Sequence, residues 1–407
     1  MAIAKAEINM KTVGVVAEFN PFHNGHEYFL REAKRLANAD YLICAMSPDF
    51  VQRGEMAVIS EKRRAKAALL AGADVVVAMP LHFSTAAAEI FAEGGINTLL
   101  STRAVDSLCF GVENVDYEGE GVGILRRAAE LLCNETDSFK ECLKEKLKDG
   151  ATYPAAVSMA VAKELGEKYA DAFSTPNSAL GCFYFKALIK ASSKVLNEVS
   201  AVKRSTEPQM KSATQIREDI GNSKEYVPEY ASDLSNALTL KDFDEMLETK
   251  LIEDFFGRED FVKELIKYQD MGEELARRIY REKNGRMDFS TLLPILKTRN
   301  VTYAHVSRAL LHVLLGIKES EVEAFRRSFY EKGGYPYLRV LGFKKSAASV
   351  MKKMNEESRS EIIMNLSECE NSSFFKTDMY GKLLYDRVYA RKYSEKPEYE
   401  FAGPVIL

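Results

Sequence analysis

Two histidines, His23 and His26, flank the dipeptide Asn24-Gly25. Their ring N–H groups can donate hydrogen bonds to phosphate oxygens and stabilise the negative charge that accumulates when a phosphorus atom is attacked. Gly25 has no side chain, so a ligand can approach the backbone closely at this position. The residue types and their spacing therefore predict a site that holds a phosphate group during nucleophilic attack.

The residues around the histidines predict a strand, a turn and a helix. Residues 12–19 are mostly apolar and β-branched, as in a strand buried on both faces of a parallel sheet. Asn20-Pro21 ends the strand, because proline removes a backbone donor and disfavours a helix at the preceding residue. Apolar residues recur at helical spacing after Gly25, which places His26 in a first helical turn, where free N–H groups attract anions.

Further alternation of strands and helices predicts an α/β fold. Strands are expected over residues 41–46, 74–79, 107–110 and 195–202, helices over 60–71 and 85–101, and an inserted group of helices over 120–172. This order predicts a Rossmann-like, doubly wound parallel sheet, whose ligands bind beyond the carboxyl ends of the strands. Only helical patterns follow. We therefore expect a Rossmann-like domain over residues 1–228 and an all-helical C-terminal domain over residues 229–407.

The composition is typical of a globular cytoplasmic protein. The 407 residues are 46% hydrophobic and 29% charged, with a net charge of −4. No apolar run approaches the length of a membrane span, about 18 residues, and the first nine residues lack the apolar core of a secretory signal. Met10 could be the natural start. The six cysteines form no Cys-x-x-Cys pair, so we expect reduced core thiols.

The charges are unevenly placed along the chain. Residues 281–354 contain 15 Lys or Arg against 6 Asp or Glu. Such an excess can be the binding surface for a polyanion, and the alternative is an ordinary solvated helical surface.

Val15 to His26 resembles the first signature of the HIGH-motif nucleotidyltransferase superfamily, whose members transfer a nucleotide and release the rest of the triphosphate. A longer series of segments is similar to the tRNA(Met) cytidine acetate ligase family, in that family's order. These segments are Gly14 to His26, Phe50 to Glu55, Phe110 to Asn114, Ser174 to Ser178 and Lys297 to Tyr303. No Lys-Met-Ser-Lys-Ser loop is present, which disfavours attachment of an amino acid to the end of a tRNA.

The resemblance implies a two-step ligase. Acetate attacks the α-phosphate of ATP to give acetyl-adenylate and pyrophosphate. The exocyclic amine of the wobble cytidine of elongator tRNA(Met) then takes the acetyl group, which yields N-acetylcytidine and AMP. Magnesium is expected on the triphosphate, without a dedicated protein cage.

The resemblance also implies the site residues. His23 and His26 are the catalytic pair, on the phosphates. The loop that binds ATP comprises Val16, Ala17, Glu18, Phe19, Asn20, Pro21, Phe22, His23, Asn24, Gly25, His26, Glu27, Tyr28 and Phe29, joined by Gly111, Asn177 and Arg204. Taken alone, Gly111 suits a tight turn, Asn177 suits a helix N-cap and Arg204 suits a surface cation.

A second signature is expected near residue 212. Ser212-Ala-Thr-Gln-Ile-Arg217 is similar to the superfamily's Ser-Ser-Thr-x-Ile-Arg, in which hydroxyls and a guanidinium meet the β- and γ-phosphates. Ser212, Thr214 and Arg217 are thus candidates for phosphate binding. Ala213 departs from the pattern, and helix capping by Ser212 is the alternative.

Other polar residues are candidates for contacts with the substrates. Gln52 to Glu55 could form a loop that closes over them. The candidates for tRNA phosphate contacts are Lys297, Arg299, Arg308, Arg339, Lys344 and Lys345. Tyr303 and Tyr337 could stack on an unpaired anticodon base or simply cover the core. His305 and His312 share a helical face, which suits packing better than metal binding.

Two other functions fit the same residues. An adenylyltransferase of this superfamily would retain AMP in a stable small-molecule product. A regulator that binds tRNA would keep the nucleotide fold without turnover, although the intact His23, Gly25 and His26 argue against it. The residues that hold acetate, the basis of tRNA selection and the oligomeric state do not follow from the sequence.

Overall fold

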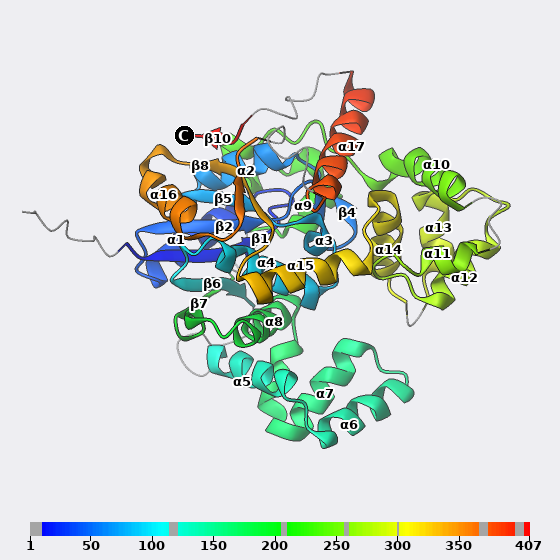
Figure 1. Ribbon diagram of the computed structural model, residues 1–407, viewed down its shortest axis with the longest axis horizontal. Helices are drawn as coiled ribbons and strands as arrows, with labels where there is room; N and C mark the ends of the chain where they lie inside the picture. The colour runs from blue at the N-terminus through cyan, green and yellow to red at the C-terminus, as the bar shows by residue number, and fades with distance from the viewer. Residues whose placement is uncertain are drawn as a thin grey trace, which may run out of the picture.

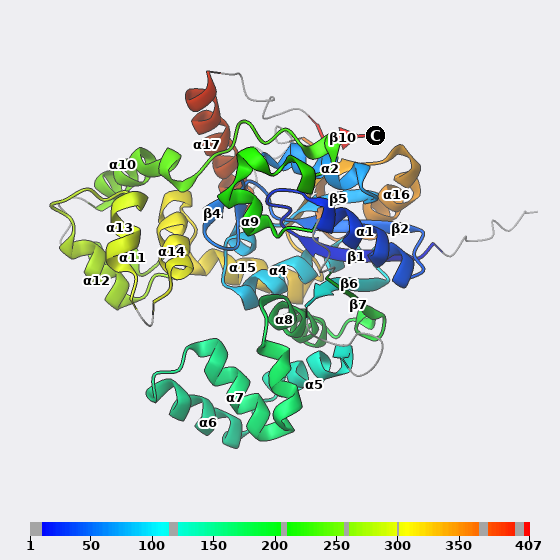
Figure 2. The same cartoon turned by 180° about the vertical axis from the view of Figure 1, so that it is seen from behind.

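The computed structural model describes residues 10–113, 121–204, 210–255, 260–298, 301–365, 373–394 and 403–407. A twisted sheet covered by helices forms the centre of the molecule, and two helical lobes project from it (Figures 1 and 2). The predicted extension, residues 1–9, lies outside the described part of the chain.

Five strands form the parallel part of the sheet. They are β1 (Thr12–Ala17), β2 (Tyr41–Met46), β5 (Val75–Ala78), β6 (Ser107–Val112) and β7 (Val199–Lys203), in the order β5-β2-β1-β6-β7. Strand β1 lies in the middle, with Val13 opposite Leu42 of β2 and Ser107 of β6. The Rossmann-like doubly wound sheet is therefore confirmed.

Alternate residues of the strands pack on opposite faces, as the pleat requires. On one face Cys44 and Val76 pack with Leu30 of α1 (Asn24–Leu36), where α2 (Glu61–Leu70) also lies. On the other face Ile43 and Val77 share a core with α4 (Ala88–Ser101), α8 (Pro176–Lys190), α15 (Glu319–Lys332) and α16 (Ala348–Glu357). Both faces are covered, so the strands are apolar throughout.

The expectation that only helices follow residue 229 is wrong. Strand β8 (Tyr337–Phe343) lies antiparallel beside β5, and the short strands β9 (Glu361–Ile363) and β10 (Val405–Ile406) pair with β8. Strand β8 is buried along nearly all of its length, and the periodicity of a short apolar run does not distinguish a buried strand from a helix. The domain boundary at residue 228 stays a prediction.

The first lobe is the group of helices predicted within residues 120–172. It contains α5 (Gly121–Cys133), α6 (Asp137–Lys148) and α7 (Tyr153–Leu165). The second lobe has its own apolar core and contains α10 (Asp244–Phe255), α11 (Phe261–Leu265), α12 (Glu273–Arg281), α13 (Phe289–Leu296) and α14 (Tyr303–Leu315). Helices α3 (Leu81–Ser84), α9 (Ala213–Glu218) and α17 (Lys376–Tyr393) lie between this lobe and the sheet (Figure 1).

A small hairpin connects the sheet with the second lobe. Strands β3 (Phe50–Val51) and β4 (Glu55–Met56) pair antiparallel, and Phe50 and Met56 belong to the lobe's core. At the tip, Gly54 has a φ of +76° and approaches α14 so closely that a Cβ would lie 2.4 Å from the backbone nitrogen of Arg308. Only glycine fits there. The loop predicted at residues 52–55 is thus a docked turn.

Among the described residues, Cys44, Cys109, Cys133, Cys142 and Cys182 are free thiols, as predicted, and Cys369 lies outside them. None of the helices described is long and apolar enough to cross a membrane.

Candidate active site

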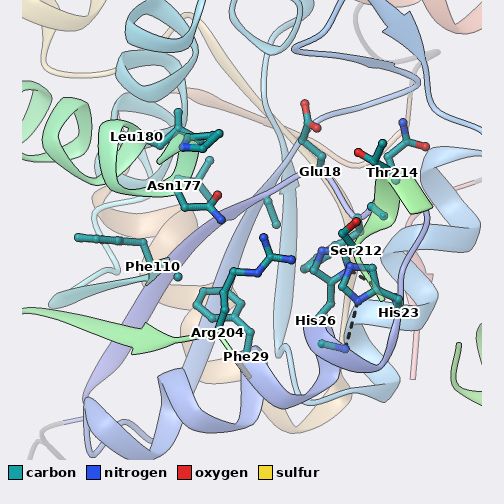
Figure 3. A pocket seen from close by; sticks show the side chains of 18 of the residues that line it. Glu18, His23, His26, Phe29, Phe110, Asn177, Leu180, Arg204, Ser212 and Thr214 are labelled. Carbon is teal, nitrogen blue, oxygen red and sulfur yellow. Dashed lines mark hydrogen bonds between the residues drawn. The ribbon is translucent and has the colours of Figure 1, made fainter. Parts of the chain in front are cut away.

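A cavity of about 340 Å³ opens at the carboxyl ends of β1, β6 and β7, against the first turns of α1, α8 and α9. Figure 3 shows its side chains converging from these elements. Most of the predicted site residues line it: Val16, Ala17, Glu18, Phe19, Asn20, His23, Gly25, His26, Tyr28, Phe29, Gly111, Asn177, Arg204, Ser212, Thr214 and Arg217. Pro21, Phe22, Asn24 and Glu27 do not.

The two histidines cap helix α1 and stack on each other. His23 is the N-cap, and its Nδ1 accepts a hydrogen bond from the Gly25 N–H at 3.1 Å. The Nδ1 of His26 accepts from the His23 N–H at 3.3 Å, and the ring centroids lie 3.6 Å apart. Because each Nδ1 is an acceptor, the proton of each neutral ring lies on Nε2. This assignment leaves two N–H donors.

Both rings are neutral at physiological pH. Burial lowers the pKa of His23 to about 3, and the Arg204 guanidinium contributes to the shift. Burial also lowers the pKa of His26 well below its ordinary value, and the positive charges of His23, when it is protonated, and of Arg204 add to this shift. A neutral ring can donate a hydrogen bond from Nε2 but has no imidazolium proton to transfer.

Two phenylalanines pack against the ring of His26. Phe19 contacts His26 edge-on with a centroid distance of 4.9 Å, and Phe22 lies 5.6 Å from the same ring. Phe19 adopts a φ of +52°, which is uncommon for a residue with a side chain. Phe22 was predicted within the binding loop, but it is buried behind the histidines.

Asn177 and Arg204 meet at a carboxylate that was not predicted as a site residue. The Asn177 side-chain amide donates to Glu113 at 2.5 Å, and Arg204 donates to the same oxygen at 3.2 Å. Thr175 caps α8, so the N-cap alternative for Asn177 is wrong. Glu113 immediately follows β6, and its position just beyond a strand end is the signal that could have found it.

Residues of the second signature cap helix α9 and contact the turn that contains the first signature. The Ser212 hydroxyl accepts from the Gln215 N–H and caps α9, so the capping alternative is correct. Arg217 donates to the Asn20 carbonyl at 2.6 Å and thereby links α9 to the turn before the histidines. Ser212 and Thr214 also face the cavity (Figure 3), and their contact with phosphate stays a prediction.

Positive charge surrounds the cavity. Arg53, Lys203, Arg204, Lys211 and Arg217 line it, against a single acidic residue among the described lining residues. Lys203 and Lys211 were not predicted, although Lys203 precedes the predicted Arg204 in the chain. With the two Nε2–H donors, this lining suits a ligand with several negative charges.

Two cationic residues predicted to contact tRNA phosphates are buried beside carboxylates, and these two predictions are wrong. Arg339 is 6% exposed, and its guanidinium donates two hydrogen bonds to Glu61. Arg308 is 9% exposed and donates from Nε to Asp270 at 2.7 Å. For Tyr337 the core alternative is correct, because this residue is only 2% exposed.

The other candidates lie on two separate parts of the surface. Lys297 and Tyr303 are exposed on the second lobe, beside α13 and α14. Lys344 is half-buried and Lys345 is exposed, between β8 and α16 at the other end of the molecule (Figures 1 and 2). Arg299 lies outside the described residues. Their contacts with tRNA stay predictions.

Within the described part of the chain, no three His, Cys, Asp or Glu side chains gather in a way that could hold a metal ion. His312 is fully buried, and its ring nitrogens are hydrogen-bonded to the carbonyls of Gln269 and Thr85.

Residues 10–400 match the family HIGH Nucleotidyl Transferase, so the fold and the site define a nucleotidyltransferase of the HIGH class. A tRNA(Met) cytidine acetate ligase of Caldanaerobacter subterraneus subsp. tengcongensis is 30% identical over 98% of this chain and 100% of the relative. One of Acetivibrio thermocellus is 31% identical over 88% and 89% of the two chains. The chain belongs to the tRNA(Met) cytidine acetate ligase family, which confirms the resemblance seen in its sequence.

Two solved structures are similar to this chain over nearly its whole length. Thermotoga maritima TmcAL bound with alpha-thio ATP matches with a TM-score of 0.85 at 25% identity, over 98% of this chain and 100% of that one. Its apo form matches with a TM-score of 0.84 at 26% identity.

Proposed function

We propose that this ligase binds ATP in the cavity at the strand ends, activates acetate as acetyl-adenylate, and transfers the acetyl group to the wobble cytidine of elongator tRNA(Met). The observation that carries the proposal is the histidine pair, which lines a cavity with several cations and keeps one N–H donor, Nε2–H, on each ring. The family and the ATP analogue bound to the Thermotoga maritima protein support it.

In the first step, an acetate oxygen attacks the α-phosphorus and the bond to the bridging oxygen of pyrophosphate breaks. Negative charge accumulates on the α-phosphate oxygens and then on the departing pyrophosphate. His23 and His26 would donate to the former, while Arg217, Arg204 and Lys211 would meet the latter. Magnesium would bind to phosphate oxygens and water, and no step is assigned to it.

In the second step, the cytidine amine attacks the acetyl carbonyl and AMP leaves. The tRNA would approach from the second lobe, where Lys297 and Tyr303 are exposed, and the enzyme would act in the cytoplasm. An adenylyltransferase of small molecules would instead retain AMP in its product, so release of AMP separates the two functions.

Two assays test the proposal with the purified full chain. Acetate-dependent exchange of labelled pyrophosphate into ATP measures activation, and labelled acetate recovered in tRNA measures transfer. We expect exchange that requires acetate, and acetylation of elongator tRNA(Met) with one AMP released per acetyl group. A folded protein that binds ATP but acetylates no tRNA would refute the ligase function.

Gly111 provides a prediction about ATP binding. Among the described residues, a Cβ at this position would meet only the Val202 carbonyl, 4.0 Å away, so a side chain there would project into the cavity and leave the strand intact. We expect Gly111→Val to weaken ATP binding about tenfold or more, since the nucleotide loses close-packed space. Calorimetric titration with ATP would measure the change. Gly111→Ala should give a smaller loss, and unaltered affinity in both variants would show that Gly111 does not face the nucleotide.

A further inference from the structure

Glu18 is the acidic residue of the cavity lining. It follows β1 directly and, in Figure 3, lies between Asn177 and Thr214, above the two histidines in the view. The sequence placed Glu18 in the ATP-binding loop without a role for its carboxylate. Because the ligand of this cavity carries negative charge, a carboxylate here opposes ATP binding and needs a separate explanation.

The carboxylate is held in one orientation. Its Oε1 accepts a hydrogen bond from the backbone N–H of Gln52 at 2.7 Å. Gln52 belongs to the turn of the β3–β4 hairpin, and the Ser307 hydroxyl fixes that turn by donating to the Gly54 carbonyl at 2.6 Å. No donor among the described residues binds Oε2, so this oxygen is free to accept a proton from a substrate.

The surroundings of Glu18 make it a stronger base than an ordinary glutamate. Burial raises the pKa of Glu18, and the Gln52 N–H together with the guanidiniums of Arg217, Arg53 and Arg64 offsets only part of the shift. Tyr184 of α8 also lines the cavity; burial raises its pKa, and the negative charge of Glu18 adds to that shift. A group that gains affinity for a proton while remaining in contact with the cavity suits general base catalysis.

The two chemical steps differ in their need for a base. Acetate attacks ATP as an anion and releases no proton. The exocyclic amine of cytidine is uncharged, and it must lose a proton when it becomes an amide. A base is therefore useful only in the transfer step.

We propose that the Glu18 carboxylate is the general base that takes the proton from the attacking cytidine amine. The amine nitrogen bonds to the acetyl carbonyl carbon, and the bond from that carbon to the phosphate oxygen breaks with its electron pair leaving on AMP. The proton moves from nitrogen to Oε2 of Glu18 and passes to solvent after the products leave. This inference rests on the proposed ligase function and adds a catalytic residue to its second step.

The variant Glu18→Gln tests the role. Its amide oxygen can still accept from the Gln52 N–H, while the charge and the basicity are lost. The pKa of Glu18 is raised in the folded protein, so ionisation of Glu18 lowers the stability of the fold at pH values above the ordinary pKa of a glutamate. At pH 7 the variant should therefore have an unfolding temperature equal to or higher than that of the wild type. Glu32→Gln is the matched control, because Glu32 pairs with Arg35 on α1, outside the cavity.

Single-turnover reactions with labelled acetate, ATP and tRNA would follow both steps in one mixture. We expect Glu18→Gln to slow transfer to tRNA by about 10²-fold or more, with acetyl-adenylate accumulating, while pyrophosphate exchange falls far less. The wild-type transfer rate should rise with pH to a plateau, and this rise should vanish in the variant. Glu32→Gln should behave as wild type.

Equal losses in exchange and transfer, or an unchanged pH profile, would overturn the role of Glu18 and leave the ligase function standing. A wild-type protein that neither exchanges pyrophosphate nor acetylates tRNA would instead overturn the proposed function. Glu18→Asp keeps a carboxylate on a shorter side chain, and recovery of the pH-dependent rise in this variant would support a proton-transfer role over a structural one.

Discussion

Replacing His23 or His26 with alanine should slow acetate-dependent pyrophosphate exchange by about 10²- to 10³-fold, the usual cost of losing one donor to a transition-state oxyanion. Each ring is neutral and keeps its proton on Nε2, because its Nδ1 accepts a backbone N–H. The rates would be measured at saturating ATP and acetate, so that weaker ground-state binding does not mask the effect on the chemical step.

The N-cap role of His23 can be separated from its chemistry. Asparagine is a good N-cap, so His23→Asn should preserve the start of α1 while losing the Nε2–H donor. We expect His23→Asn to be as inactive as His23→Ala but more stable. Because the pKa of His23 lies at about 3, the wild-type exchange rate should show no histidine titration between about pH 5 and 8. Full activity in His23→Asn would remove the imidazole from the mechanism.

The histidine site was predictable because the residues that determine its structure are neighbours in the sequence. Two side chains separated by Asn24-Gly25, a preceding apolar strand and a following helical pattern fix the turn without knowledge of distant residues. Other predicted cavity-lining positions lie near strand ends or in first helical turns, where α/β sheets bind their ligands: Gly111 is the penultimate residue of β6, and Asn177 lies in the first turn of α8. The structure places both residues in the cavity lining, and their contacts with ATP stay predictions.

What the sequence could not supply depends on partners far away in the chain. Strand β8 is a short apolar run, and only its pairing with β5 identifies it as part of the sheet. Arg339 looks like a surface cation until Glu61, on α2, is seen beside it. Arg308 likewise pairs with Asp270. A cationic side chain in one sequence carries no sign of whether its counter-ion is a phosphate or a buried carboxylate.

The misassigned Arg339 belongs to a buried charge cluster that joins β8 and α17 to Glu61 of α2 and to Asp49. Glu61 and Arg339 side chains are 1% and 7% exposed. The Glu61 backbone N–H donates to Asp49 at 2.6 Å, and Lys382 of α17 lies 3.3 Å from the other Asp49 oxygen. Burial raises the pKa of Glu61, but Arg339 outweighs burial and brings that pKa to about 2. The pair is therefore ionised under all ordinary conditions.

Glu61→Ala should lower the free energy of unfolding by about 3–5 kcal/mol, because Arg339 would remain buried without its partner. The double variant Glu61→Leu with Arg339→Met should lose much less free energy of unfolding, because apolar side chains fill the space and neither residue leaves the other as an unpaired charge. Urea unfolding of the wild type, both single variants and the double variant would give the coupling free energy between Glu61 and Arg339. As the pH falls from about 4.5 toward 2, the wild type loses this stabilisation and the gap to Glu61→Ala should narrow. Additive losses in the double variant would contradict a coupled buried pair and reopen the assignment of Arg339.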